Sequence, residues 1–268
     1  MPIPDYTLVV GVDAKHLKQL AMVWPTWRKH KPSLLAHPMI VFYDTLQVND
    51  RSVQAIVDHP NLRIIPWEPK LGIYDPKPGV EIDKWNNPQR YKMLAGFVYV
   101  PGNRVQTPYW LKIDTDVVAT EYDDWIDGRW FNDYPAIISH PWGFTRPADQ
   151  ILRLDRWAQS HRITLRFSTG PLNLVPEPGA TRVHHKRIIS WCGFFNTKFT
   201  HHAASAAAMT TGNCLLPEPS QDGYLWYMAT RQELPIVTTS MKRRGWQHWS
   251  NDHNVREHAK EAMECSSS

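Results

Sequence analysis

Cysteine is scarce in this sequence. Only Cys192, Cys214 and Cys265 occur among 268 residues, and no CxxC pair is present. The odd, widely spaced set argues against a disulfide framework, and the missing CxxC spacing argues against a zinc site built from paired cysteines. The sequence therefore predicts a protein of a reducing compartment.

Long hydrophobic runs and a strong charge of one sign are also missing. No apolar run approaches the roughly 20 residues of a membrane-spanning helix, and the N-terminal MPIPDYTLVV has no basic stretch before its apolar residues. Lys and Arg number 30 against 26 Asp and Glu, and this net charge of +4 permits binding to a polyanion without requiring it. We expect a cytoplasmic protein, or one of the host-cell cytoplasm if its source is viral, with no membrane partner; its oligomeric state stays open.

Tryptophan and proline are abundant instead. The chain has 13 Trp and 22 Pro, within 42% hydrophobic and 21% charged residues. That balance predicts a folded chain with one continuous core. Indole rings offer flat faces for sugar rings and bases, although most of them are expected to fill the core. The prolines predict long ordered loops around a compact scaffold.

Strands and helices alternate along the first part of the chain. Runs rich in strand-forming residues lie at 6–13, 38–44, 62–67 and 109–117. Between them, apolar residues recur at helical spacing from Leu17 to Trp24, from Val53 to Val57 and from Tyr91 to Val98. This alternation predicts an α/β fold in a single domain, with a mainly parallel central sheet flanked by helices.

The second half is less regular. The patterns predict strands at 135–141, 187–197 and 235–240, and helices near 151–158, 200–210 and 220–233. A Pro-rich stretch, 171–179, is more typical of a loop that shapes a site than of a domain linker. The polar tail at 259–268 is expected to be flexible.

Two carboxylates stand just where an apolar strand ends. They are Asp114 and Asp116 in the run Lys112–Val117. In an extended chain, residues i and i+2 share a face, so both carboxylates can converge on one cation. A few hard oxygen ligands suit Mg²⁺ or Mn²⁺ with positions left open for phosphate oxygens. The alternative is that the pair merely caps a loop.

This Asp-x-Asp motif, placed mid-chain after three αβ-like units, resembles that of the nucleotide-sugar glycosyltransferases of the GT-A fold, which is Rossmann-like. The resemblance covers about residues 6–250 as a pattern. It implies a donor-binding half at 1–118 and an acceptor-binding half at 119–258. It also implies that Asp116 is a direct metal ligand, and that Asp114 contacts the donor ribose or sugar, or the metal through water.

A second acidic position lies at the head of a late helix. Asp222 follows Pro219, Ser220 and Gln221, and simple helix capping would account for it. In the GT-A enzymes that this chain resembles, an acidic residue at this place faces the acceptor, which implies Asp222 as the general base. The preceding WCGFF segment resembles the glycine-containing strand that lines their sugar pocket, and implies that Gly193 leaves room for the donor; a β-bulge is the alternative.

A basic cluster lies near the end of the chain. Lys242 and Arg243 can neutralise a leaving diphosphate, and His248 stands five residues beyond Arg243. Several GT-A families place a C-terminal histidine on the metal, which implies His248 here, with His253 as the alternative. A solvated basic turn backed by packed Trp residues is the other interpretation.

Further candidate donor contacts lie earlier in the chain. Arg90 and Lys92 precede the motif strand on a helix, where residues two apart cannot share a face, so at most one of them reaches the phosphates. Gly11 and Asp13 close the first strand, where the resemblance implies the nucleotide base and ribose. Asp13 could instead cap the helix that follows.

The resulting prediction is a metal-dependent enzyme that transfers a hexose from a UDP-sugar, most simply UDP-glucose, to an acceptor hydroxyl. The geometry is expected to be inverting if Asp222 is the base. A small GT-A chain with basic loops looks like the DNA-base glycosyltransferases associated with TET/JBP-type dioxygenases, the group that includes base J glucosyltransferases. That resemblance implies a 5-hydroxymethylpyrimidine in DNA as the acceptor. The alternatives are a glycan acceptor, a phosphatase of the haloacid dehalogenase type, and a non-enzymatic module that binds nucleic acid or carbohydrate.

Overall fold

The structure is a computed structural model. It describes residues 2–68, 88–121, 123–131, 137–163, 182–188, 191–211, 216–217, 221–232, 234 and 236–264. The Pro-rich stretch 171–179, Cys214 and Cys265 lie outside the described residues. Arg90 and Lys92 lie in a helix, but their side chains are outside the description, so their predicted contacts with the donor phosphates stay predictions.

The first part of the chain forms the predicted parallel sheet. Its elements are β1 (Tyr6–Val12), α1 (Ala14–His30), β2 (Met39–Asp44), α2 (Asp50–Gln54), β3 (Leu62–Trp67), α3 (Pro88–Arg104) and β4 (Tyr109–Ile113). The strands lie in the order β3-β2-β1-β4 and all pair in parallel. Because parallel strands end at one edge, the carboxyl ends of β1 and β4 lie next to each other.

The second part extends this sheet with antiparallel strands. Its elements are β5 (Val117–Ala119), β6 (Ile137–Pro147), α4 (Ala148–Ser160), β7 (Arg182–Ile188), β8 (Cys192–Asn196), α5 (Thr197–Thr211), α6 (Gln221–Arg231), β9 (Ile236–Thr238), β10 (Trp246–His248) and α7 (Asp252–Glu264). Short 3-10 helices are η1 (Pro32–Ala36), η2 (Gly128–Phe131) and η3 (Met241–Arg244). Strand β8 pairs with β4 and β6, while β10 and β5 form a separate antiparallel ribbon.

Two expected strands are each divided in the structure. The run 109–117 ends as a strand at Ile113, because Asp114 starts a turn in which the Val117 amide donates to its carbonyl at 3.3 Å. The run 187–197 belongs to β7 up to Ile188 and to β8 from Cys192. The Asp-x-Asp motif therefore occupies a turn between β4 and β5.

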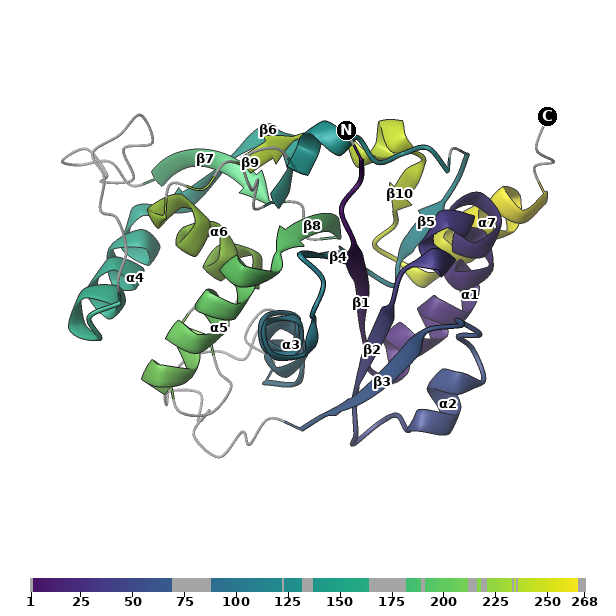
Figure 1. The fold of residues 1–268 in the computed structure, drawn as a ribbon, viewed down its shortest axis with the longest axis horizontal. Helices are drawn as coiled ribbons and strands as arrows, with labels where there is room; N and C mark the ends of the chain where they lie inside the picture. Colours follow the sequence, from purple (N-terminus) through teal and green to yellow (C-terminus); the bar gives the residue numbers. More distant parts are fainter. Residues whose placement is uncertain are drawn as a thin grey trace.

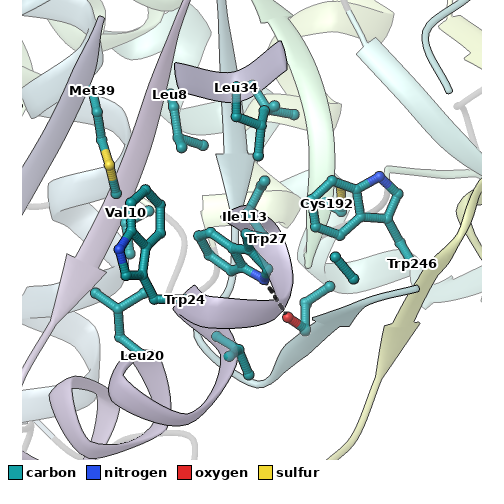
Figure 2. Packing of buried hydrophobic residues seen from close by; sticks show 14 of the residues in the cluster. Leu8, Val10, Leu20, Trp24, Trp27, Leu34, Met39, Ile113, Cys192 and Trp246 are labelled. Atoms are coloured by element: carbon teal, nitrogen blue, oxygen red, sulfur yellow. Dashed lines mark hydrogen bonds between the residues drawn. The ribbon is translucent and has the colours of Figure 1, made fainter. Parts of the chain in front are cut away.

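Helices cover both faces of the sheet (Figure 1). A cluster of buried hydrophobic side chains lies between the sheet and the helices on each side. Helices α3, α5 and α6 lie on one side, and α1 and α7 on the other. Figure 2 shows the second cluster, where Trp27 of α1 lies between Trp24 and Trp246. The indole Nε1 of Trp27 donates to the Val117 carbonyl at 2.7 Å. This bond ties α1 to the strand that follows the motif.

The last helix, α7, was not predicted from the sequence. Residues 259–264, expected to belong to a flexible tail, form the end of α7. The reason is amphipathic packing: Val255, Ala259 and Ala262 are buried on one face of this otherwise polar helix. Nowhere in the described ranges is a helix long and apolar enough to cross a membrane.

Candidate active site

Backbone hydrogen bonds from two other segments hold the turn between β4 and β5. The Asp114 amide donates to the Trp191 carbonyl at 2.8 Å, beside β8. The Trp249 amide donates to the Asp116 carbonyl at 3.0 Å, at the end of β10. The turn therefore lies between the sheet and the β5–β10 ribbon, at the carboxyl end of a strand, where open α/β sheets bind their ligands.

The structure brings His248 to Asp116. The pairing of β10 with β5 places His248 opposite Val117, and the imidazole Nε2 lies 3.4 Å from Asp116 Oδ2. The ring of His248 also stacks on Trp191, with centroids 5.6 Å apart and planes 7° from parallel. His253 is an exposed residue in the first turn of α7. Of the two predicted histidines, His248 is the one that faces the motif.

Asp114 makes a different contact. Its carboxylate pairs with the Nζ of Lys112, which is only 2% exposed and also lies 4.5 Å from the centroid of the Phe97 ring. Strand alternation explains the pairing, because positions 112 and 114 are two apart and share a face. The contact with the buried Lys112 Nζ fixes the direction of the Asp114 carboxylate. The two aspartates therefore have different surroundings.

Sequence reasoning missed Lys112 as part of the site. The signal was present in the chain: a lysine within an apolar strand run, two residues before an aspartate, is costly to bury unless it has a charged partner. Gly193 lies directly opposite Lys112 in the β4–β8 pairing. That register is continuous along both strands, so the alternative explanation of Gly193 as a β-bulge is not supported.

Asp13 lies at the carboxyl end of β1, next to β4, and caps α1. Its Oδ1 accepts from the His16 amide at 2.8 Å and lies 2.8 Å from the His16 Nδ1. Burial alone would raise the pKa of this carboxyl, but the hydrogen bonds and charge of His16 lower it below its usual value. Capping thus accounts for Asp13, and its contact with a nucleotide stays a prediction.

Gly11 is explained by packing. A side chain built on it would collide with the ring of Phe42, which lies over this position from the neighbouring strand β2. The space left by the missing side chain is filled by an aromatic ring of the core. A donor contact at Gly11 would have to come from its backbone.

The basic cluster and His248 lie at opposite ends of β10. Lys242 and Arg243 are exposed on η3, before the strand, whereas His248 is its last residue. Strands rise about 3.3 Å per residue, so three strand residues separate η3 from the motif by about 10 Å. The structure does not bring the backbone of Lys242 and Arg243 to Asp116, and their predicted contact with a diphosphate at the motif is untested.

Buried Lys31 fixes this far end of the ribbon. Its Nζ donates to the carbonyls of Glu121 at 2.7 Å and Arg244 at 3.1 Å, and lies 5.4 Å from the Trp246 ring centroid. Gly245 completes the turn in the left-handed region, at φ 75°, where a side chain would collide with the Glu121 carbonyl. Lys31 and Gly245 together fix the start of β10, and thereby the position of His248 at its end.

We expect Lys31 to make stability depend on pH. Its burial lowers the pKa of the ammonium from 10.5 to about 8. Between these values the unfolded chain holds the proton and the folded chain does not, so stability rises with pH. The free energy of unfolding of the wild type, minus that of Lys31→Met, is expected to increase by on the order of 1 to 3 kcal/mol from pH 8 to pH 10.5. Urea denaturation of both proteins at each pH measures this; a flat difference would contradict it.

Asp222 lies in the first turn of α6, as predicted, and is partly buried. Helix α6 packs against α3, α5 and β7 on the face of the sheet opposite α1. Its far end is anchored to α4, because Asp155 accepts from Arg231 and from the hydroxyl of Tyr227 at 2.7 Å. The helix that carries Asp222 is thus a fixed part of the second half of the fold.

The residues at the turn fit a hard divalent cation. Asp116 Oδ1 is buried and has no hydrogen-bond partner among the described residues, which is costly for a carboxylate oxygen unless a ligand satisfies it. Carboxylate oxygens suit Mn²⁺ and Mg²⁺, and a neutral imidazole is a common metal ligand. The described residues contain no cluster of three His, Cys, Asp or Glu that could hold a metal alone. Mg²⁺-type sites commonly use one or two carboxylates and complete their shell with water and substrate phosphates.

The sheet, its antiparallel extension and the motif after β4 define a GT-A fold in a single domain. Core-mannan synthase A from Aspergillus fumigatus, in its Mn/GDP form, has this fold: the match has a TM-score of 0.53 and 12% identity, over 91% of this chain and 74% of that one. The galactosyltransferase LgtC, solved with donor and acceptor sugar analogues, matches with a TM-score of 0.51 and 10% identity, over 97% of this chain and 98% of its own. No protein-family model and no curated protein matches the sequence.

Proposed function

We propose that this protein is a glycosyltransferase that transfers a hexose from a nucleoside diphosphate sugar to an acceptor hydroxyl, with a divalent metal at the Asp-x-Asp turn. The observation that carries the proposal is the buried Oδ1 of Asp116, which has no hydrogen-bond partner in the described part of the chain, while Oδ2 faces His248 at the carboxyl edge of the sheet. The GT-A fold supports it, because one of the structural neighbours described above is named a galactosyltransferase and the other a core-mannan synthase.

In this proposal Asp116 and His248 hold Mn²⁺ or Mg²⁺, which supplies positive charge for the leaving diphosphate. Asp114 is held in place by Lys112 and accepts a hydrogen bond from a ribose or sugar hydroxyl of the donor. Asp222 takes the proton of the acceptor hydroxyl. The acceptor oxygen then bonds to the anomeric carbon as the bond from that carbon to the diphosphate breaks, with inversion.

We take UDP-glucose as the first donor to test, and GDP-mannose as the second because core-mannan synthase A was solved with GDP and manganese. The test is the release of nucleoside diphosphate from UDP-glucose, UDP-galactose and GDP-mannose, with Mn²⁺ and with EDTA. Release from at least one donor that stops with EDTA is the expected result. The absence of release from every donor, with and without acceptor, would contradict the proposal.

The proposed acceptor is a 5-hydroxymethylpyrimidine in DNA. Its support is electrostatic: Lys242 and Arg243 are exposed on η3, and the sequence of β7, RVHHKRI, is basic. Lys and Arg side chains can hold DNA phosphates while an aromatic surface receives the exposed base. A glycan acceptor is the second candidate, since LgtC was solved with an acceptor sugar analogue. Radiolabelled sugar appearing in hydroxymethylated DNA, and not in unmodified DNA, would distinguish the two.

A further inference from the structure

The residue between the two aspartates points inward. Thr115 is 2% exposed, and its hydroxyl donates to Oε1 of Gln19 on α1 at 3.0 Å. The side chains of Asp114 and Asp116 are 29% and 22% exposed. Thr115 and Asp116 belong to the turn between β4 and β5. The buried hydroxyl of Thr115 therefore anchors this turn to α1, while the carboxylates on either side of it stay partly exposed.

Gln19 is itself held by a second helix. It is 2% exposed, and its Nε2 donates to Oδ1 of Asp252, the first residue of α7, at 2.7 Å. The amide of Gln19 thus connects the motif on one side with α7 on the other. Lys15 also approaches Asp252, at 3.9 Å, but this exposed pair contributes little.

The other end of α7 is also bound to α1. Nε2 of His30 donates to the Ala262 carbonyl at 2.7 Å, and Nζ of Lys29 donates to the Met263 carbonyl at 2.7 Å. Basic groups at the carboxyl end of a helix satisfy its last carbonyls and its dipole. Because Gln19 meets the start of α7 and His30 meets its end, the two helices run side by side in the same direction. This fixes Asp252 relative to Gln19.

We infer that Gln19 is a positioning residue of the metal-nucleotide site, acting through Thr115, with Asp252 of α7 fixing its amide. The inference rests on the proposed function. Gln19 and Asp252 need not touch the donor; they hold the turn so that Asp114 and Asp116 face the edge before any ligand arrives. Outer groups of this kind usually change metal affinity about 10- to 100-fold when they are removed.

The test compares two replacements of Thr115. Thr115→Val keeps the shape and removes the hydroxyl, whereas Thr115→Ser keeps the hydroxyl. Calorimetric titration of UDP with Mn²⁺ is expected to give about tenfold weaker binding for Thr115→Val, and affinity within about twofold of wild type for Thr115→Ser. If Thr115→Val binds like the wild type, the inference is wrong.

Thr7→Val is the matched control. Thr7 is a buried threonine near the start of β1, whose hydroxyl bonds to that of Thr107 at 2.8 Å, at the opposite edge of the sheet from the motif. Thr7→Val should lower the melting temperature about as much as Thr115→Val and leave UDP affinity unchanged. An equal loss of affinity in Thr7→Val would mean that the effect of Thr115→Val is general destabilisation, and would overturn the inference.

A second measurement needs no metal. In the metal-free protein, hydrogen exchange of the peptide that covers residues 111–119 is expected to be faster in Thr115→Val and Gln19→Leu than in wild type, because the turn opens more easily. A double-mutant cycle on UDP affinity adds to this: Gln19→Leu combined with Thr115→Val should weaken binding no more than either change alone. Additive losses, or unchanged exchange, would overturn the inference.

These outcomes separate the inference from the proposed function. One outcome is that wild type binds UDP with Mn²⁺, Asp116→Ala does not, and Thr115→Val binds like wild type. The proposed function is then supported, and the positioning role of Gln19 is wrong. If the wild type binds no nucleoside diphosphate with Mn²⁺, both the proposed function and the inference about Gln19 are wrong.

Discussion

Asp116→Ala is expected to lose metal-dependent nucleotide binding almost entirely. Asp116 supplies a buried oxygen without a partner among the described residues and a second oxygen that faces His248, so no nearby carboxylate of the motif replaces it: Asp114 is already paired with Lys112. Since removal of supporting groups alone costs about 10- to 100-fold in metal affinity, we expect a loss of at least about 100-fold here. Calorimetry with UDP and Mn²⁺ measures it.

The control for this prediction is Asp127→Ala. Asp127 directly precedes η2 and is paired with Arg129 of η2, whose side chain is 77% exposed, and an ion pair open to solvent in this way contributes little to stability. Asp127→Ala should keep both the fold and UDP affinity. Retention of Mn²⁺-dependent affinity within about twofold in Asp116→Ala would show that the metal ligand was assigned wrongly.

Asp222→Asn is expected to separate binding from transfer. Asparagine keeps the size of the side chain and its place in the first turn of α6 but cannot take a proton at neutral pH. Loss of a general base slows transfer by about 10²- to 10⁴-fold. Donor affinity should stay within about twofold of wild type, because the leaving diphosphate is held elsewhere. Initial rates of transfer and a parallel titration with UDP measure the two effects.

Asp222→Glu serves as the matched variant, since it keeps a carboxylate with one more methylene. It should retain part of the transfer rate, and its rate should fall at acidic pH as the carboxylate protonates, whereas the small residual rate of Asp222→Asn should lack this dependence. Full transfer activity in Asp222→Asn would show that Asp222 is not the general base, and a retaining mechanism would then stay open.

The sequence predicted the strands around the Asp-x-Asp turn because their local residue patterns are strong. The alternation of strands and helices up to β4 predicted a mainly parallel sheet, and β3, β2, β1 and β4 are parallel neighbours in the structure. The motif follows the end of a strand, as expected. The strand that continued through Asp116 in the prediction ends at Ile113 in the structure. Local propensity favours a strand through residues 109–117, but the backbone hydrogen bonds that Asp114 donates to Trp191 and Asp116 accepts from Trp249 hold the motif as a turn.

Other parts of the site depend on contacts between distant segments. His248 reaches Asp116 only because β10 pairs with β5 in a particular register, and the same register carries Lys242 and Arg243 to the other end of the ribbon. Gln19 bonds to Thr115 across 96 positions of sequence, and no local pattern marks it. Lys112 was visible in the sequence, yet its role follows from burial against Phe97 of α3, a contact that depends on how α3 packs on the sheet.

The central claim is that a nucleoside diphosphate binds at the Asp-x-Asp turn through a divalent metal. Titration of UDP into the wild-type protein, first with Mn²⁺ and then with EDTA, tests it most directly, with GDP as the parallel ligand. We predict saturable binding of one of the two nucleotides that requires Mn²⁺ and disappears with EDTA. Binding of equal strength in EDTA, or no binding of either nucleotide with Mn²⁺, would contradict the claim.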